Sequence, residues 1–130
     1  MLKSLNGIRL VGLSLLGIAT FGTLVTLIIA PYLINILTGG GFLGASYSLQ
    51  ILSLGFPAYF LSSLLMWFLI TKGKYKTTLL LYTSGCLINL ILNFIYIPQY
   101  SFLAASWITV ISEYLILIMQ VITLRGILFK

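Results

Sequence analysis

Apolar residues fill four long segments of this chain, and short polar stretches separate them. The segments cover residues 10–37, 47–70, 77–97 and 102–124, and none of them contains Lys or Arg. Each is longer than the ~20 residues that an α-helix needs to cross about 30 Å of hydrocarbon at 1.5 Å per residue. The pattern predicts an all-α integral membrane protein, a single transmembrane domain over residues 1–130 with four antiparallel transmembrane helices.

Helix-breaking residues interrupt this pattern at three places. The first segment is long enough to require a tilt or a kink, and we expect the kink at Pro31, which lacks a backbone N–H. Gly55 and Pro57 predict a second kink in the next segment. Three consecutive glycines at positions 39–41 predict a flexible turn between these two segments.

Composition supports a membrane location. Hydrophobic residues make up 61% of the chain and charged residues 6%, with a mean hydropathy of +1.19. Soluble globular domains carry about 25% charged residues. An ordinary soluble domain is therefore excluded, and membrane lipid is the expected environment.

The positive charges are distributed very unevenly. They lie before the first segment, between the second and third, or after the fourth, at Lys3, Arg9, Lys72, Lys74, Lys76, Arg125 and Lys130. The loops at residues 38–46 and 98–101 carry none. By the positive-inside rule, both termini and the lysine loop are predicted to be cytoplasmic. We interpret the net charge of +6 as a topology signal with some attraction for anionic lipid, and not as a nucleic-acid-binding surface.

Polar residues of the third segment recur at helical spacing. Tyr82, Gly85, Asn89, Asn93 and Tyr96 are separated by 3, 4, 4 and 3 positions, so they share one helix face. An amide without a hydrogen-bond partner is costly in hydrocarbon, so this face is expected to meet another helix or a wet cavity. Two interpretations stay open: the Asn side chains hold helices together, or they line a path for a polar substrate.

The fourth segment repeats the arrangement with Ser106, Thr109, Glu113 and Gln120. Glu113 is the only acidic residue of the chain and lies near the middle of its segment. An acid inside a membrane is by default a candidate for proton or cation coupling. The alternative is a neutral carboxyl group that forms a hydrogen bond with Asn89 or Asn93 across the helix pair.

Residues for soluble catalysis or metal binding are missing from the sequence. The chain has no His, no Asp, one Cys and one Glu, which leaves no catalytic triad, carboxylate pair or zinc ligand set. We therefore expect no enzyme activity, no cofactor and no metal site. Cys86 is expected to be a small apolar packing residue.

The stretch from Asn89 to Glu113 resembles the polysaccharide flippases, which translocate O-antigen or capsule repeat units. They belong to the superfamily that also holds multidrug extrusion transporters. Their late helices often read Asn-x-x-Leu-Asn-x-x-x-Ile-Pro-x-Tyr-Gly-x-x-Gly-Ala-Ala-x-Ala-Thr-x-x-Ser-Glu. The matching residues here are Asn89, Leu92, Asn93, Ile97, Pro98, Tyr100, Ala105, Thr109, Ser112 and Glu113. The likeness extends upstream to about Gly39, whereas Ser101, Ala104, Ser106 and Ile108 depart from the family pattern.

This resemblance implies a function and a location. Family members have about twelve to fourteen helices in two lobes around a cavity, so the chain is similar to a C-terminal part of such a transporter. The implied substrate is a lipid-linked oligosaccharide for polysaccharide biosynthesis, and the implied location is the bacterial cytoplasmic (inner) membrane. The implied partner is the remaining lobe or a second copy of the chain. Candidates for the substrate path or for helix packing are Tyr82, Asn89, Asn93, Thr109 and Glu113, and Pro98 and Tyr100 are expected to shape the outer turn.

Two other functions remain as alternatives. Small multidrug transporters also have four helices and one membrane-embedded Glu that exchanges protons for lipophilic cations. That family carries its Glu in the first helix, and the first segment here has no acidic residue. The second alternative is a membrane scaffold without transport activity, in which replacement of Glu113 would change little beyond stability.

Overall fold

A computed structural model describes residues 2–128 of the chain, and these residues are almost entirely helical. The helices are α1 (Leu2–Thr38), α2 (Leu43–Ser53), α3 (Phe56–Thr71) and α4 (Tyr75–Leu128). Helix α1 thus begins before residue 10, where the first apolar segment was predicted to start. Of the residues predicted to carry topology signals, Lys130 lies outside the described part of the chain.

Two of the described helices are long and apolar enough to cross a membrane. They are the 30 residues Arg9–Thr38 of α1 and the 53 residues Tyr75–Ile127 of α4. Helices α2 and α3 meet at an angle of 41° and provide a third candidate if the bent pair is taken as one span. The kink predicted around Gly55 and Pro57 is therefore present, as a complete break between two helices.

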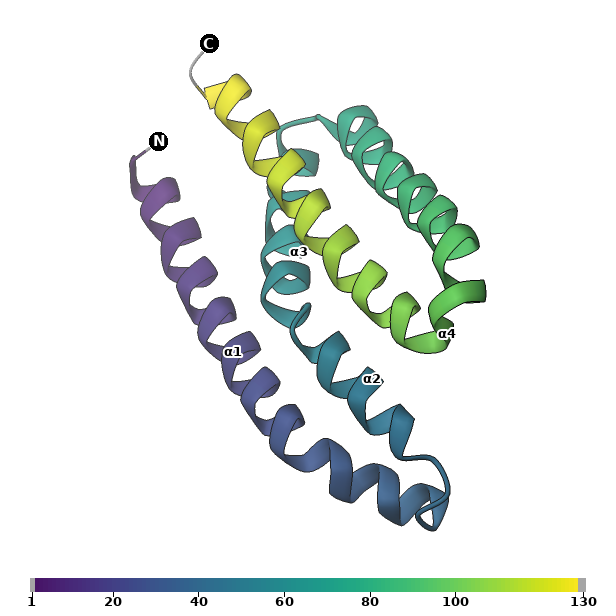
Figure 1. The fold of residues 1–130 in the computed structure, drawn as a ribbon. Helices are drawn as coiled ribbons and strands as arrows, with labels where there is room; N and C mark the ends of the chain where they lie inside the picture. The colour runs from purple at the N-terminus through teal and green to yellow at the C-terminus, as the bar shows by residue number, and fades with distance from the viewer. Residues whose placement is uncertain (1, 129–130) are drawn as a thin grey trace.

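Helix α4 contains both the third and the fourth predicted segments because it folds back on itself. Ser101 is its one residue with non-helical backbone angles, at φ 60° and ψ −158°. Figure 1 shows the two arms of α4 running side by side in opposite directions on either side of this reversal. Pro98 and Tyr100 are still helical, so the reversal lies at Ser101, at the end of the predicted Pro98–Ser101 turn.

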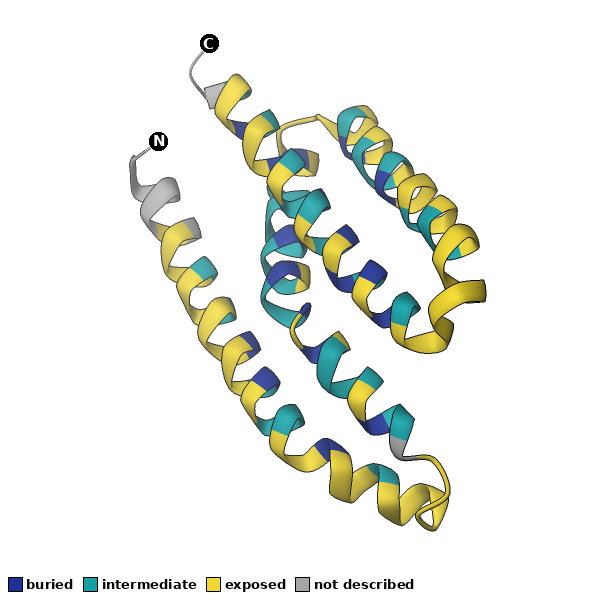
Figure 2. Ribbon diagram, viewed as in Figure 1, coloured by how far each residue is buried: buried dark blue, intermediate teal, exposed yellow. Residues whose placement is uncertain are grey.

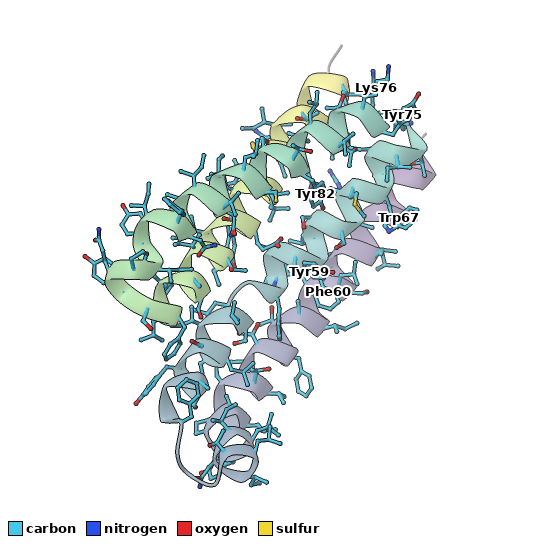
Figure 3. The ribbon with its side chains drawn as sticks, turned by 90° about the vertical axis from the view of Figure 1, so that its right-hand side faces the viewer. Tyr59, Phe60, Trp67, Tyr75, Lys76 and Tyr82 are labelled. Carbon is cyan, nitrogen blue, oxygen red and sulfur yellow. The ribbon has the colours of Figure 1, made fainter. Side chains whose placement is uncertain are left out.

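Helices α2 and α3 form the centre of the molecule, since they contact α1 on one side and α4 on the other. The beginning of α1, the end of α4 and the α3–α4 turn gather at one end of the bundle (Figure 1). Figure 3 places Tyr75 and Lys76 at this end as well. The segments that carry the basic residues therefore lie together in space, as the charge pattern predicts for one side of a membrane.

Small residues allow α1 to pack closely on the central helices. Ala19, Thr23 and Ala30 on this face are exposed by 9% or less. A Cβ atom on Gly22 would lie 3.7 Å from the Phe56 ring, an ordinary van der Waals contact. The opposite face of α1 carries large apolar side chains that are exposed, such as Phe21, which is 70% exposed. Figure 2 shows the buried and exposed faces along the helix. Such a surface suits hydrocarbon better than water.

Two prolines leave backbone carbonyl groups without their helical donors, and side chains from the neighbouring helix replace those donors. Pro31 cannot donate to the carbonyl of Leu27, and Gln50 Nε2 of α2 donates to that oxygen at 2.8 Å. Pro57 likewise cannot donate to Ser53, whose carbonyl oxygen accepts from Thr23 Oγ1 of α1 at 2.7 Å. Helices α1 and α2 therefore exchange hydrogen bonds at the places where the prolines weaken them.

The turn between α1 and α2 follows the glycine prediction. Gly39 and Gly40 adopt φ of 60° and 84°, a region that residues with a side chain rarely enter. The N–H of Gly40 donates to the carbonyl of Asn35 at 3.3 Å, and so satisfies one free carbonyl at the end of α1. Phe42 then packs against Phe102, just past the reversal of α4, with ring centroids 5.4 Å apart.

Candidate functional site: a polar cleft between the arms of α4

The two arms of α4 approach each other closely at Gly85. A Cβ atom at this position would lie 2.6 Å from Cγ1 of Ile116 on the opposite arm, which is shorter than real Cβ contacts. A side chain at this position would therefore displace Ile116, and glycine avoids this, as is common where helices pack closely in membranes. The predicted polar face of the third segment thus faces the fourth segment at this level.

Polar side chains connect the arms one turn further along. Asn89 Nδ2 donates to Ser112 Oγ across the hairpin at 3.0 Å. Asn93 Nδ2 donates to Asn89 Oδ1 at 2.8 Å along the first arm, and Asn93 Oδ1 is buried without a partner. We call Asn93, Asn89 and Ser112 the amide ladder. In this ladder both Nδ2 and Oδ1 of Asn89 have a hydrogen-bond partner, whereas only Nδ2 of Asn93 has one.

A second polar group joins three helical segments nearer the basic end of the bundle. Gln120 Nε2 from the second arm donates to Tyr82 Oη at 3.3 Å, and Tyr82 Oη is 3.5 Å from the carbonyl oxygen of Ser62 on α3. Gln120 is 0% exposed, and its Oε1 is buried without a partner. This group therefore ties the hairpin to α3 while it leaves one acceptor unused.

Between these two groups lies a polar cleft of about 310 Å³. The first arm contributes one half of the lining and the second arm the other half: Tyr82, Gly85, Cys86, Asn89, Thr109, Ser112, Glu113 and Ile116. Figure 3 shows Tyr82 on the arm that starts at Tyr75, beside α3. The cleft is the place in the described structure where the only acid of the chain meets the amide and hydroxyl groups of both arms.

Glu113 also reaches the opposite side of the second arm. There it lines another cleft, of about 290 Å³, with Gly55, Phe56 and Tyr59 at the break between α2 and α3. Next to it along the chain, Tyr114 Oη donates to the carbonyl oxygen of Leu54 at 3.1 Å, within the break itself. The acid is thus positioned between the hairpin and a discontinuous helix, an arrangement that transporters use at substrate and ion sites.

The remaining hollows are mainly apolar. The largest, about 540 Å³, lies on the hairpin nearer the reversal and is lined by residues that include Tyr96, Tyr100 and Trp107. Asn93 lines a separate hollow of about 440 Å³ with Phe94 and Pro98. These surfaces contain few polar groups, so the polar chemistry of the hairpin is concentrated in the cleft at Glu113.

The structure brings four of the five candidate residues together in the polar cleft: Tyr82, Asn89, Thr109 and Glu113. The fifth, Asn93, is joined to them through Asn89 but opens onto a different hollow. The ladder runs from Asn89 to Ser112, so the hydrogen bond that we considered between an Asn side chain and Glu113 is replaced by one to the neighbouring residue. Among the described residues, no group of His, Cys, Asp or Glu is suited to hold a metal ion.

Three residues that form hydrogen bonds in the structure, Ser112, Gln50 and Thr23, were not among the site candidates. They differ in whether the sequence could have indicated their role. Ser112 lies eleven residues after Ser101 and Asn89 twelve before it, so the position of the reversal would have indicated their pairing. The roles of Gln50 and Thr23 could not be predicted in this way. A proline identifies the carbonyl that loses its donor, but nothing local in the sequence identifies the side chain that replaces it.

Comparisons with known proteins add no relative. No protein-family model matches the chain, and no curated protein and no solved structure is significantly similar to it.

Proposed function

We propose that this chain is part of a membrane transporter that moves a lipid-linked oligosaccharide across the bacterial cytoplasmic membrane. The observation that carries this proposal is the polar cleft between the arms of α4. Glu113, Asn89, Thr109 and Tyr82 converge there within helices that are otherwise apolar. In this proposal, polar groups of the substrate pass along the cleft while its lipid tail stays among the exposed apolar side chains.

The orientation of the proposed transporter follows from its basic residues. The turn between α3 and α4 carries Lys72, Lys74 and Lys76, and it lies at the same end of the bundle as both described chain ends. This end would face the cytoplasm, where positively charged loops are retained. The α1–α2 turn and the reversal at Ser101 would face outward. A second lobe, or a second copy of the chain, would cover the open side of the hairpin.

Three features of the cleft favour transport over simple helix packing. The cleft is lined by an acid at a position where burial of charge costs roughly 2.5–3.5 kcal/mol on insertion scales. It is hollow, with a volume large enough for several water molecules or one sugar ring. It also adjoins the break between α2 and α3, and membrane proteins tolerate irregular backbone mainly where it is buried in protein or lines a cavity.

A translocation assay tests this proposal directly. Everted membrane vesicles from cells that produce the full chain would be loaded with a fluorescent polyprenyl-pyrophosphate disaccharide, and its movement followed with a membrane-impermeant quencher. We expect movement above that of vesicles without the chain. Glu113→Gln should slow it about tenfold, which corresponds to about 1.4 kcal/mol of lost stabilisation.

The matched control is Asn35→Ala, compared with Asn89→Ala. Asn35 is an exposed amide at the end of α1, whereas Asn89 lines the cleft. Asn35→Ala should leave translocation unchanged, and Asn89→Ala should reduce it. Equal rates for Glu113→Gln, Asn89→Ala and the unmodified chain, all above the rate of vesicles without the chain, would show that the cleft is not the path. Movement no faster than in vesicles without the chain would refute the transport role and favour a scaffold.

A further inference from the structure

We propose that the polar cleft between the arms of α4 binds a protonated primary amine, held against the carboxylate of Glu113. The inference rests on the proposed function, because it assumes that molecules moved by the protein reach this cleft. It adds the chemical group that is recognised there. It also assigns the phosphate groups of a lipid-linked substrate to some other part of the path.

The first reason is that the polar side chains around the cleft offer more acceptors than free donors. Thr109 Oγ1 donates to the carbonyl of Ala105 at 2.8 Å, and Asn89 Nδ2 donates through one of its two N–H groups to Ser112 Oγ at 3.0 Å. Tyr82 Oη is directed at the carbonyl of Ser62. The second N–H of Asn89 and the hydroxyl hydrogen of Ser112 are not used in these bonds, whereas the hydroxyl oxygens keep lone pairs and the carboxylate of Glu113 offers only lone pairs. An occupant rich in donors therefore suits the cleft, and an ammonium group carries three donors whereas a fully ionised phosphate group carries none.

The second reason is charge. Glu113 is the only acidic residue of the chain, and the nearest basic residue after it on the same arm is Arg125. Twelve residues separate them, which is about 18 Å along a helix. The lysines of the α3–α4 turn lie at that same distant end of the bundle. A neutral hydroxyl group satisfies only the lone pairs of the carboxylate, whereas an ammonium ion also balances its charge.

The third reason is the aromatic surroundings. Tyr82 lines the polar cleft with Glu113, and Tyr59 lines the adjoining cleft that Glu113 also borders. Aromatic rings attract ammonium groups through their negative faces, by about 0.5–2 kcal/mol. The volume of about 310 Å³ equals that of about ten water molecules, at about 30 Å³ each, so it accommodates an amine together with the ring or chain that carries it.

Chemical labelling of Glu113 provides the test, because the chain has no other acidic side chain. The full chain would be reconstituted in phosphatidylcholine vesicles, which contain no primary amine. Dicyclohexylcarbodiimide, which modifies carboxyl groups in membranes, would be added with octylammonium, octyl phosphate or octyl glucoside, and labelling quantified by mass spectrometry. Because octylamine converts a carbodiimide-activated carboxyl group to an amide, the N-acylurea and the octylamide are both counted as labelled. Octylammonium at roughly ten times its Kd should slow labelling of Glu113 about tenfold by mass action.

Controls separate specific protection from general effects on the membrane. The α-carboxyl group of the reconstituted chain is an internal reference, and its labelling should stay constant. Tyr82→Phe removes one hydrogen-bond acceptor from the cleft and should weaken the protection of Glu113 by octylammonium. Tyr32→Phe changes an exposed tyrosine of α1 and should not.

Every outcome decides the inference. Protection by octylammonium alone supports it. Equal or stronger protection by octyl phosphate or octyl glucoside overturns it, and so does the absence of protection by any of the three. Because labelling requires no transport, protection without translocation activity would overturn the proposed function and leave the amine site intact. Translocation that depends on Glu113, without protection of Glu113 by octylammonium, would overturn the amine site and leave the proposed function intact.

Discussion

The backbone carbonyls at the junction of α1 with α2 and α3 differ from the side-chain amides of the α4 hairpin in how completely they are paired. Ser48 Oγ on α2 is also buried without a partner, so the difference concerns these two sets of groups and not every polar atom of the junction. At the junction, the two carbonyls that Pro31 and Pro57 deprive of a donor accept from Gln50 and Thr23. In the hairpin, the side-chain oxygens of Asn93 and Gln120 are buried without partners. Glu113 lies outside the amide ladder and lines two clefts.

This contrast indicates which polar groups stabilise the fold and which are available to bind a ligand. Polar groups that are fully paired hold helices in place, and little is left for a ligand to bind. An acid beside a hollow and outside a paired network costs stability, so it is expected where another molecule supplies the missing donors. We therefore expect substitutions at the junction to affect folding first, and substitutions at the cleft to affect ligand binding first.

The largest expected effect is at the junction. In the double variant Thr23→Val with Gln50→Leu, the carbonyls of Ser53 and Leu27 both lose their donors. Each unpaired carbonyl costs about 1–3 kcal/mol, so the free energy of unfolding should fall by about 2–6 kcal/mol if the two costs add. Unfolding by SDS in mixed micelles, followed by circular dichroism, measures this loss.

A rescue variant sharpens this prediction. Pro31→Ala returns a backbone N–H to α1, so the carbonyl of Leu27 regains a helical donor. Gln50→Leu should then cost less in the Pro31→Ala background than in the original chain. An equal cost in both backgrounds would contradict the view that Gln50 stabilises the protein by replacing the donor that proline removes.

The next effect concerns the close approach of the α4 arms. Gly85→Val places methyl groups against Ile116 and should destabilise the hairpin by about 1–3 kcal/mol through overpacking. Gly17→Val is the matched control, because a Cβ atom at Gly17 meets nothing within 4 Å. Similar SDS midpoints for the two variants would show that the arms are not in contact at Gly85.

A smaller effect distinguishes the two members of the amide ladder on the first arm. Asn89→Leu breaks the bonds to both Ser112 and Asn93, and it should cost about 0.6–2 kcal/mol, the range measured for polar bonds between membrane helices. Asn93→Leu removes one bond together with an unpartnered oxygen, so its cost should be lower. The reverse order in SDS unfolding would place the bridging role at Asn93.

The smallest effect is expected at Gln120. Its Nε2 donates to Tyr82, but its Oε1 is buried without a partner. Gln120→Leu therefore loses one hydrogen bond and at the same time removes one unpaired buried oxygen. The free energy of unfolding should stay within about 1 kcal/mol of the original value, or rise. A loss well beyond this range would show that the oxygen of Gln120 has a partner in the folded protein.

Much of the helical architecture could be predicted because it depends on local pattern. The apolar segments, the glycines at 39–41 and the spacing of Tyr82, Gly85 and Asn89 predicted the helices, a turn and a shared polar face. The limits of the helices were less accurate, since α1 begins before residue 10 and the reversal lies at Ser101 alone. Helix ends depend on backbone bonds that composition specifies only weakly.

The sequence by itself determined that the chain forms long apolar helices with few polar groups, because hydrophobicity and helical period are properties of residues close together in the chain. Only the tertiary structure decided which polar groups meet. Gln50 and Leu27 are 23 residues apart, and Tyr114 and Leu54 are 60 apart. Contacts over such separations depend on how whole helices pack, and that packing leaves Glu113 beside an open cleft instead of within the amide ladder.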